Sequence, residues 1–150
     1  MTKSLQNKTA VVTGSSSGIG RSIAVALAKG GANIVLHGRR PSKRIDDVAS
    51  ELQGFGVDTK FLYADFEKVE SWEDFVGEAW TWKNGVDVWV NNAGGDVLTG
   101  QWKDKSLVQK LDYLFQVDVK ATLLLSRIVG RRMASQTNTR FGAAGSSSII

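Results

Sequence analysis

The sequence predicts an α/β fold, a doubly wound parallel sheet with helices on both faces. Two observations lead to it. Short apolar runs rich in valine and isoleucine alternate with longer segments whose apolar residues recur at helical spacing. The first apolar run, Ala10-Val11-Val12, also leads through a glycine-rich turn into the first helical segment. Strands that alternate with helices in this way form parallel sheets.

The first half of the chain contains two strand–helix units. The apolar runs predict strands at residues 9–13 and 33–37, where β-branched residues favour extended backbone. A helix at residues 19–29 separates them, and residues 42–52 form a second helix. The apolar residues that we expect to line the first helix are Ile23, Val25, Ala26 and Leu27.

The next unit consists of a strand at residues 59–63, a helix at residues 69–82 and a strand at residues 86–91. Its helix carries an apolar stripe of Trp72, Phe75, Val76, Ala79 and Trp80. Aromatic residues at this helical spacing indicate a core face rather than a cofactor site.

A polar stretch to residue 106 precedes a long helix at residues 107–133, which is apolar around much of its circumference in its second half. Such a helix is buried on more than one side, so we expect a homo-oligomer formed through it. Residues 136–148 read as a loop, and Ile149-Ile150 as the start of a fifth strand. We therefore expect one domain over residues 1–150, truncated at the start of the fifth strand.

Composition limits the classes of protein. The chain has 150 residues, no cysteine and one histidine, which excludes a disulfide framework and argues against a metal site. The net charge is +4, but the basic residues are scattered, so we expect no nucleic-acid partner. No apolar segment is long enough for a signal peptide or a membrane span, and we expect a soluble, cytoplasmic protein.

The glycine-rich turn carries the first chemical signal. Gly14, Gly18 and Gly20 give the spacing G-x-x-x-G-x-G between a strand and a helix. Glycines let the backbone approach a pyrophosphate closely, and the start of the helix attracts its negative charge. By itself the spacing is equally compatible with close packing between helix and sheet.

A second motif, Asn91-Asn92-Ala93-Gly94, follows the fourth strand. Together with Thr13-Gly14 through Gly20, it resembles the paired signatures of the short-chain dehydrogenase/reductase family. Asp65-Phe66 after the third strand matches the family pattern too, so the resemblance covers essentially the whole chain. It implies a Rossmann-type domain that binds NAD or NADP, with hydride transfer to or from an alcohol or carbonyl substrate.

The resemblance assigns cofactor-binding roles residue by residue. Asp65 would accept a hydrogen bond from the adenine amino group, beside the Phe66 backbone, although Asp65 could instead cap the next helix. Asn91 would steady the sheet through buried hydrogen bonds, and Ala93 and Gly94 would let the backbone pass close to the riboses. The residues placed around the pyrophosphate and its ribose are Gly14, Ser15, Ser16, Ser17, Gly18, Ile19 and Gly20.

The end of the second strand predicts NADP rather than NAD. It reads His37-Gly38-Arg39-Arg40, without the acidic residue that holds the ribose 2′-hydroxyl in NAD sites. A guanidinium at Arg39 or Arg40 can bind a 2′-phosphate through paired hydrogen bonds. Against this, many NADP-binding family members carry a basic residue where Ser17 stands. His37 reads as a strand-end residue beside the adenosine pocket.

No catalytic residue is assigned. The serine and the Tyr-x-x-x-Lys that the resemblance implies would follow Ile150, and neither Tyr63 nor Tyr113 has a lysine four residues later. Asp118 stands where the family has an asparagine, and an ionised carboxylate cannot donate the hydrogen bond that an amide donates. We expect the 150-residue chain alone to be inactive, and its substrate cannot be read from the sequence.

Three functional hypotheses remain. In the first, which we favour, the chain is the cofactor-binding half of an NADP-dependent oxidoreductase. In the second it is a dinucleotide-binding module without catalysis, and in the third it is a non-functional remnant. The resemblance also implies the sheet order 3-2-1-4-5-6-7. In a chain truncated at the start of the fifth strand, the fourth strand would be an almost bare edge, and the long helix would lose its cover on one side. We therefore expect the isolated chain to self-associate or aggregate.

Overall fold

A computed structural model describes residues 4–136 and 148–150, and its sheet has the predicted parallel, doubly wound arrangement. The strands are β1 (Thr9–Val12), β2 (Asn33–Gly38), β3 (Thr59–Tyr63), β4 (Val88–Val90) and β5 (Ser148–Ile149), in the order β3-β2-β1-β4-β5. The helices are α1 (Gly18–Lys29), α2 (Lys43–Gln53), α3 (Trp72–Trp82), α4 (Leu107–Leu114) and α5 (Ala121–Ser135).

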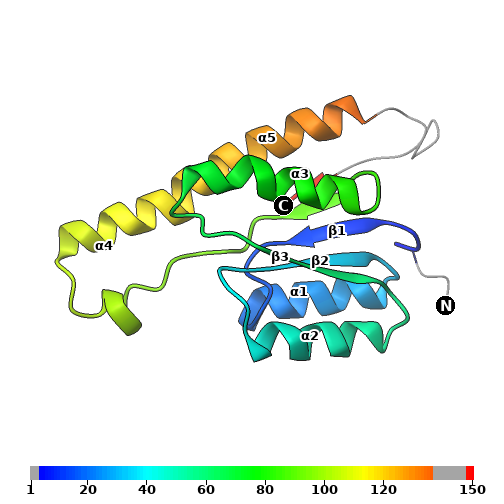
Figure 1. Ribbon diagram of the computed structural model, residues 1–150, viewed down its shortest axis with the longest axis horizontal. Helices are drawn as coiled ribbons and strands as arrows, with labels where there is room; N and C mark the ends of the chain where they lie inside the picture. Colours follow the sequence, from blue (N-terminus) through cyan, green and yellow to red (C-terminus); the bar gives the residue numbers. More distant parts are fainter. Residues whose placement is uncertain (1–3, 137–147) are drawn as a thin grey trace.

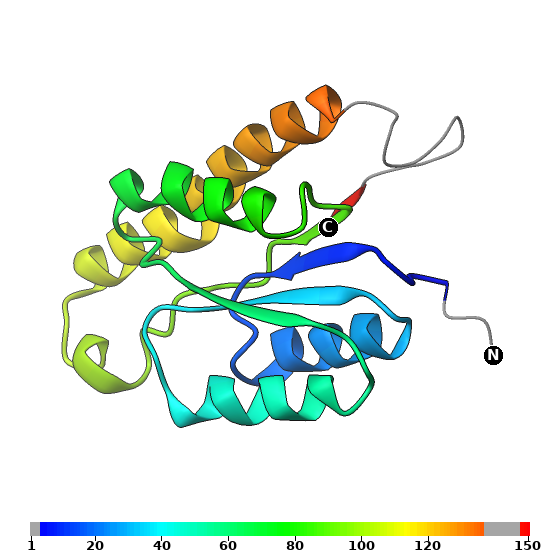
Figure 2. The same ribbon diagram turned by 45° about the vertical axis from the view of Figure 1, so that its right-hand side comes forward.

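The sheet lies between two helical layers, α1 and α2 on one face and α3 and α5 on the other (Figure 1). Successive side chains of β1 point to opposite faces: Ala10 and Val12 join the cluster under α1 and α2, whereas Val11 joins the cluster under α3 and α5. All three are fully buried, as expected for a central strand of a sheet that is covered on both sides. Figure 2 shows the same layers after a turn of the molecule.

Helix α1 packs through a different face from the predicted one. Its buried residues are Gly20, Ala24 and Ala28, spaced by four, whereas Ala26 is exposed. The larger side chains Ile23, Val25 and Leu27 lie partly buried at the sides of this face. Small residues on the contact face let the helix axis come close to the sheet, which larger ones would prevent.

The predicted helix at residues 69–82 is a 3₁₀ turn at Val69–Ser71 followed by α3. Its tryptophan stripe lies in the core as predicted: Trp72, Phe75, Val76 and Ala79 are buried, and Trp80 packs against them.

The expectation of an almost bare edge at the fourth strand is wrong for this structure. Strand β5 pairs with β4, Val88 opposite Ser148 and Trp89 opposite Ile149. The N–H of Asn91 donates to the Ile150 carbonyl at 2.8 Å, which extends the pairing beyond the strand. The predicted loop at residues 136–148 lies almost entirely outside the described residues.

The predicted continuous helix at residues 107–133 is divided by a π-helical segment, Phe115–Lys120, between α4 and α5. Helix α4 extends beyond the sheet, and a second 3₁₀ turn at Gly100–Trp102 lies below it (Figures 1 and 2). Segments of π-helix are often found at functional sites because the extra residue redirects a side chain. No helix among the described residues is long and apolar enough to cross a membrane.

Candidate cofactor-binding site

The glycine turn lies at the carboxyl end of β1, where the chain turns into α1. Gly14 and Gly18 adopt left-handed backbone, with φ of 63° and 55°. A Cβ atom on Gly14 would lie 2.8 Å from the Cα of Ala93, so this position needs glycine for its conformation and for its contact. The turn therefore brings the two sequence motifs against each other.

Thr13 and Asn92 hold this contact together, although the sequence analysis assigned no separate role to either residue. The Thr13 hydroxyl accepts hydrogen bonds from the N–H groups of Asn92 and Ala93, both at 2.9 Å. The side-chain amide of Asn92 donates to the carbonyls of Thr13 and Gly14, at 3.0 and 3.2 Å. Polar residues directly at the ends of two neighbouring strands were the signal available in the sequence.

His37 holds the turn from the other side. Its Nδ1 accepts the N–H of Gly14 at 3.0 Å, and its Nε2 lies 3.0 Å from the carbonyl oxygen of Ala64. The ring stacks on Phe66 with 4.5 Å between centroids and is 3% exposed. Burial lowers the pKa of His37 to about 4, against the opposing effect of the Ala64 hydrogen bond, so the ring is neutral near pH 7.

A cavity of about 480 Å³ opens at this end of the sheet and is shared by both motifs. Its lining includes eight of the thirteen predicted cofactor-binding residues: Gly14, Ser16, Ser17, Arg39, Asp65, Phe66, Ala93 and Gly94. Dinucleotides bind outside the carboxyl ends of the strands in sheets of this kind. Residues at or just after the carboxyl ends of β1, β2, β3 and β4 thus meet where such a ligand would lie.

The other five predicted residues do not line the cavity. Ser15 is buried and its hydroxyl accepts the N–H of His37 at 2.9 Å. A Cβ on Gly20 would overlap the Gly14 carbonyl and the Asn92 amide, whereas Gly18 faces open space and Ile19 is 74% exposed. Ser15 and Gly20 thus pack inside the turn, whereas Gly18 and Ile19 lie on its exposed side.

Asn91, the fifth, joins the sheet to α5. Its side-chain oxygen accepts the indole N–H of Trp89, and its amide donates to the hydroxyl of Ser126, both at 3.0 Å. The resemblance implied buried hydrogen bonds for Asn91, and these two bonds are partly buried. Asn91 thus ties the end of β4, which the segment with Ala93 and Gly94 follows, to α5.

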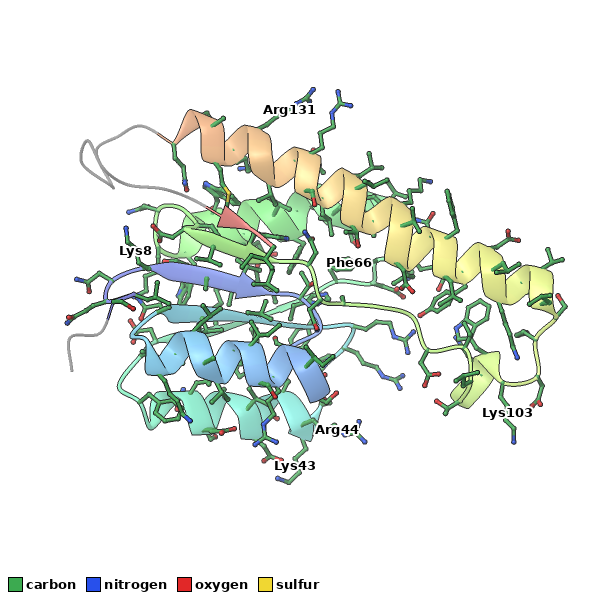
Figure 3. The ribbon with its side chains drawn as sticks, turned by 180° about the vertical axis from the view of Figure 1, so that it is seen from behind. Lys8, Lys43, Arg44, Phe66, Lys103 and Arg131 are labelled. Carbon is green, nitrogen blue, oxygen red and sulfur yellow. The ribbon has the colours of Figure 1, made fainter. Side chains whose placement is uncertain are left out.

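Asp65 and Phe66 form the wall next to β3, where Figure 3 shows Phe66 between the sheet and the long helix. One carboxylate oxygen of Asp65 accepts the N–H of Glu67 at 3.1 Å, a local capping bond. Arg39, at the end of β2, is exposed and makes no ion pair with any carboxylate in the described part of the chain. Its guanidinium is available to an anion in the cavity.

The opposite wall comes from the segment after β4 and from the long helix. The rings of Trp102 and Tyr113 stack with 4.2 Å between centroids, and both residues line the cavity. Desolvation raises the pKa of Tyr113, so its phenol stays protonated at neutral pH. Asp118, in the π-helical segment, accepts the N–H of Gly95 at 2.6 Å. Among the described residues, no cluster of acidic, histidine or cysteine side chains could hold a metal ion.

Comparison with known proteins agrees with this geometry. Residues 8–143 match the short chain dehydrogenase family. Dehydrogenase/reductase SDR family member 4 of Sus scrofa is 35% identical over 127 residues, which are 85% of this chain and 45% of the relative. Dehydrogenase/reductase SDR family member 2, mitochondrial, of Homo sapiens is 38% identical over 126 residues, 83% of this chain and 44% of the relative. The chain thus spans about half the length of the curated relatives it matches.

Solved structures give the same fold. A short chain dehydrogenase from Burkholderia cenocepacia in complex with NADP has a TM-score of 0.75 and 30% identity, covering 86% of this chain and 52% of that one. A 3-oxoacyl-[acyl-carrier protein] reductase from Brucella melitensis in complex with NAD has a TM-score of 0.80 and 29% identity, covering 96% and 54%. One neighbour holds NADP and the other NAD, so similarity alone does not choose between them.

Proposed function

Because the chain belongs to the short-chain dehydrogenase family, we propose that it binds a nicotinamide dinucleotide for an oxidoreductase acting on an alcohol or carbonyl compound. The observation that carries this proposal is the contact between the glycine turn and the segment after β4, both of which line one cavity. The bound nicotinamide would supply the hydride chemistry. The residues described here hold and orient the dinucleotide.

Each part of the cavity offers chemistry suited to one part of the dinucleotide. The turn at Gly14 to Ser17 suits the pyrophosphate, and α1 starts directly after it with N–H donors that have no intrahelical partners. Ala93 and Gly94 present backbone with little side chain to the riboses. The adenine would lie beside Asp65 and Phe66, where the second carboxylate oxygen of Asp65 can accept from its amino group.

We propose NADP as the preferred cofactor. Arg39 lines the cavity beside Gly38, which has no side chain to occupy or repel a 2′-phosphate. A guanidinium can bind phosphate oxygens through two parallel hydrogen bonds, and no carboxylate stands at this point of β2 to hold the 2′-hydroxyl of NAD. Arg40 is exposed but does not line the cavity, which makes Arg39 the better candidate of the two.

Titration with NADPH and NADH tests the proposal. Arg39→Gln should weaken NADPH binding by about tenfold or more and leave NADH binding within about twofold, because only NADPH carries the 2′-phosphate. Arg44→Gln, which removes a guanidinium outside the cavity, is the matched control (Figure 3). If the unaltered chain binds neither dinucleotide, the proposal is wrong; an equal loss of both would refute the NADP preference alone.

A dinucleotide-binding module without turnover is the second candidate. Within these 150 residues, Tyr63 is followed four residues later by Glu67 and Tyr113 by Val117, not by lysine. Oxidation of NADPH in the presence of a panel of aldehydes and ketones separates the two functions. Binding with turnover supports the oxidoreductase, and binding without turnover supports the module.

We also propose that the chain self-associates through the long helix. Seven large apolar side chains there are exposed, and we call them the apolar helix face: Leu107, Val108, Leu111, Phe115, Val119, Leu123 and Leu124. Four of these recur every four residues, from Leu111 to Leu123, so they run along one side of the helix. An exposed apolar surface of this kind marks an interaction site.

A further inference from the structure

His37 connects the two sides of the cavity. On the β1 side its Nδ1 accepts the N–H of Gly14, and on the β3 side its Nε2 lies within hydrogen-bond distance of the Ala64 carbonyl. Its backbone also pairs with Ser15 in both directions: the N–H of His37 donates to the Ser15 hydroxyl, and the N–H of Ser15 donates to the His37 carbonyl. One residue of β2 therefore fixes the glycine turn and the start of the wall that Asp65 and Phe66 form, which we call the adenine-side wall.

The partners determine the form of the ring. The N–H of Gly14 can only donate and the carbonyl of Ala64 can only accept, so both bonds exist only in the neutral tautomer with hydrogen on Nε2. Phe66 stacks on the ring at an interplanar angle of 7°, and Phe75 meets it edge-on with 4.9 Å between centroids. The aromatic contacts fix the plane of the ring, and the two hydrogen bonds fix its rotation in that plane.

We propose that His37 is a positioning residue for cofactor binding, whose neutral imidazole holds the glycine turn at a fixed distance from the adenine-side wall. This inference rests on the proposed dinucleotide function. Thr13 and Asn92 already fix the turn against β4, at the carbonyls of Thr13 and Gly14. His37 supplies the constraint from β2. It accepts from the N–H of Gly14, whereas the amide of Asn92 on the β4 side donates to carbonyl oxygens.

Two amide substitutions separate the two bonds of the ring. In His37→Asn, the side-chain oxygen can take the place of Nδ1 and keep an acceptor for Gly14, whereas the bond to Ala64 is lost. In His37→Gln, the amide nitrogen can take the place of Nε2 and keep the bond to Ala64, whereas Gly14 loses its acceptor. Both variants lose the aromatic stack, so each serves as the stability control for the other.

The readouts are the affinities for NADPH and for adenosine 2′-monophosphate, which lacks the pyrophosphate. His37→Gln should bind NADPH about tenfold more weakly and the monophosphate within about twofold, because only the turn is released. His37→Asn should keep NADPH binding within about threefold. Equal NADPH affinities of the two variants, or losses that follow only their melting temperatures, would overturn the inference. If the unaltered chain binds no NADPH, the proposed function fails first and the inference with it.

A measurement on the unaltered chain covers the case in which the variants do not fold. His37 is the single histidine, so the ¹⁵N spectrum of the imidazole nitrogens belongs to one residue. At neutral pH we expect a protonated Nε2 and an unprotonated Nδ1. A ring with its hydrogen on Nδ1 could not accept from Gly14 and would overturn the inference.

Discussion

The glycine turn and the long helix differ in whether the chain itself provides the partners that their side chains need. At the turn, the polar groups of Thr13, Ser15, His37 and Asn92 have hydrogen-bond partners inside the chain, and the first three of these residues are buried. Along the apolar helix face, by contrast, large apolar side chains remain in water; Phe115 is 62% exposed.

The turn is thus a site that one chain builds alone, whereas the apolar helix face is a surface that a second chain would have to cover. Buried polar groups that are bonded to each other cost little and fix one geometry. Exposed apolar side chains leave unused the free energy that burial provides, about 25 cal/mol for each Å². We therefore expect changes at the turn to alter folding and cofactor binding, and changes on the apolar helix face to alter assembly.

The largest effect should come from Gly14→Ala. The new Cβ would meet the backbone of Ala93 at 2.8 Å, in a residue with φ of 63°. Left-handed backbone costs about 1–2 kcal/mol and overpacking about 1–3 kcal/mol, so we expect the free energy of unfolding to fall by about 4 kcal/mol. Urea denaturation measures it.

Gly56→Ala is the matched control. Gly56 has a φ of 75°, but a Cβ there would meet nothing within 4 Å, so only the conformational cost of about 1 kcal/mol applies. If both alanine variants lose the same stability, the close contact between the two motifs is not a constraint on the fold.

The second effect is on the dependence of stability on pH. The pKa of His37 is about 4 in the folded chain, against an ordinary value of 6.5, so the unfolded chain binds this proton more readily between the two values. Stability from this group is complete above pH 6.5 and decreases as pH falls to about 4, by about 3 kcal/mol in all. Chemical denaturation at a series of pH values measures the decrease.

His37→Phe provides the control for this titration, since it keeps an aromatic ring next to Phe66 and has no imidazole. Carboxylates also titrate near pH 4, and they remain in the variant. The difference between the two pH profiles is therefore the contribution of His37. Parallel profiles between pH 6.5 and 4 would show that the ring is not neutral and buried in the folded chain.

On the apolar helix face, the double substitution Leu111→Glu with Phe115→Glu should weaken self-association by tenfold or more, about 1.4 kcal/mol or more. Two carboxylates in an apolar interface would be desolvated and would repel their counterparts in the partner. Sedimentation velocity over a range of concentrations measures the change. Leu98→Glu, on another exposed apolar side chain, should leave association unchanged. A chain that is monomeric at all concentrations before substitution would contradict the proposed interface.

The sequence was a good guide where one local pattern determines the structure. The short apolar runs located the strands, and the glycine turn with Asn91-Asn92-Ala93-Gly94 located the cavity. It failed where a contact joins distant segments. The bonds of His37 to Gly14 and Ala64 span 23 and 27 residues, and no spacing rule connects them.

Boundaries failed for a related reason. The π-helical segment at Phe115–Lys120 does not disturb the apolar period enough to be seen in the sequence, although it accompanies the bond from Gly95 to Asp118. Helix α1 packs through Gly20, Ala24 and Ala28 because the sheet requires close approach, which a scale of side-chain hydrophobicity does not reward.

The smallest effect should come from Asp118→Asn, which lies between the two regions. Its carboxylate accepts the N–H of Gly95 at 2.6 Å, and an asparagine oxygen can accept the same hydrogen bond. Only the charge assistance is lost, at an exposed position, so the free energy of unfolding should change by less than about 1 kcal/mol. Asp118→Leu, which removes the acceptor and keeps a side chain branched at Cγ, should cost more than the asparagine variant. If the two variants are equally stable, the bond to Gly95 does not hold the segment after β4, and the wall of the cavity on this side is kept in place by the stack of Trp102 on Tyr113 instead.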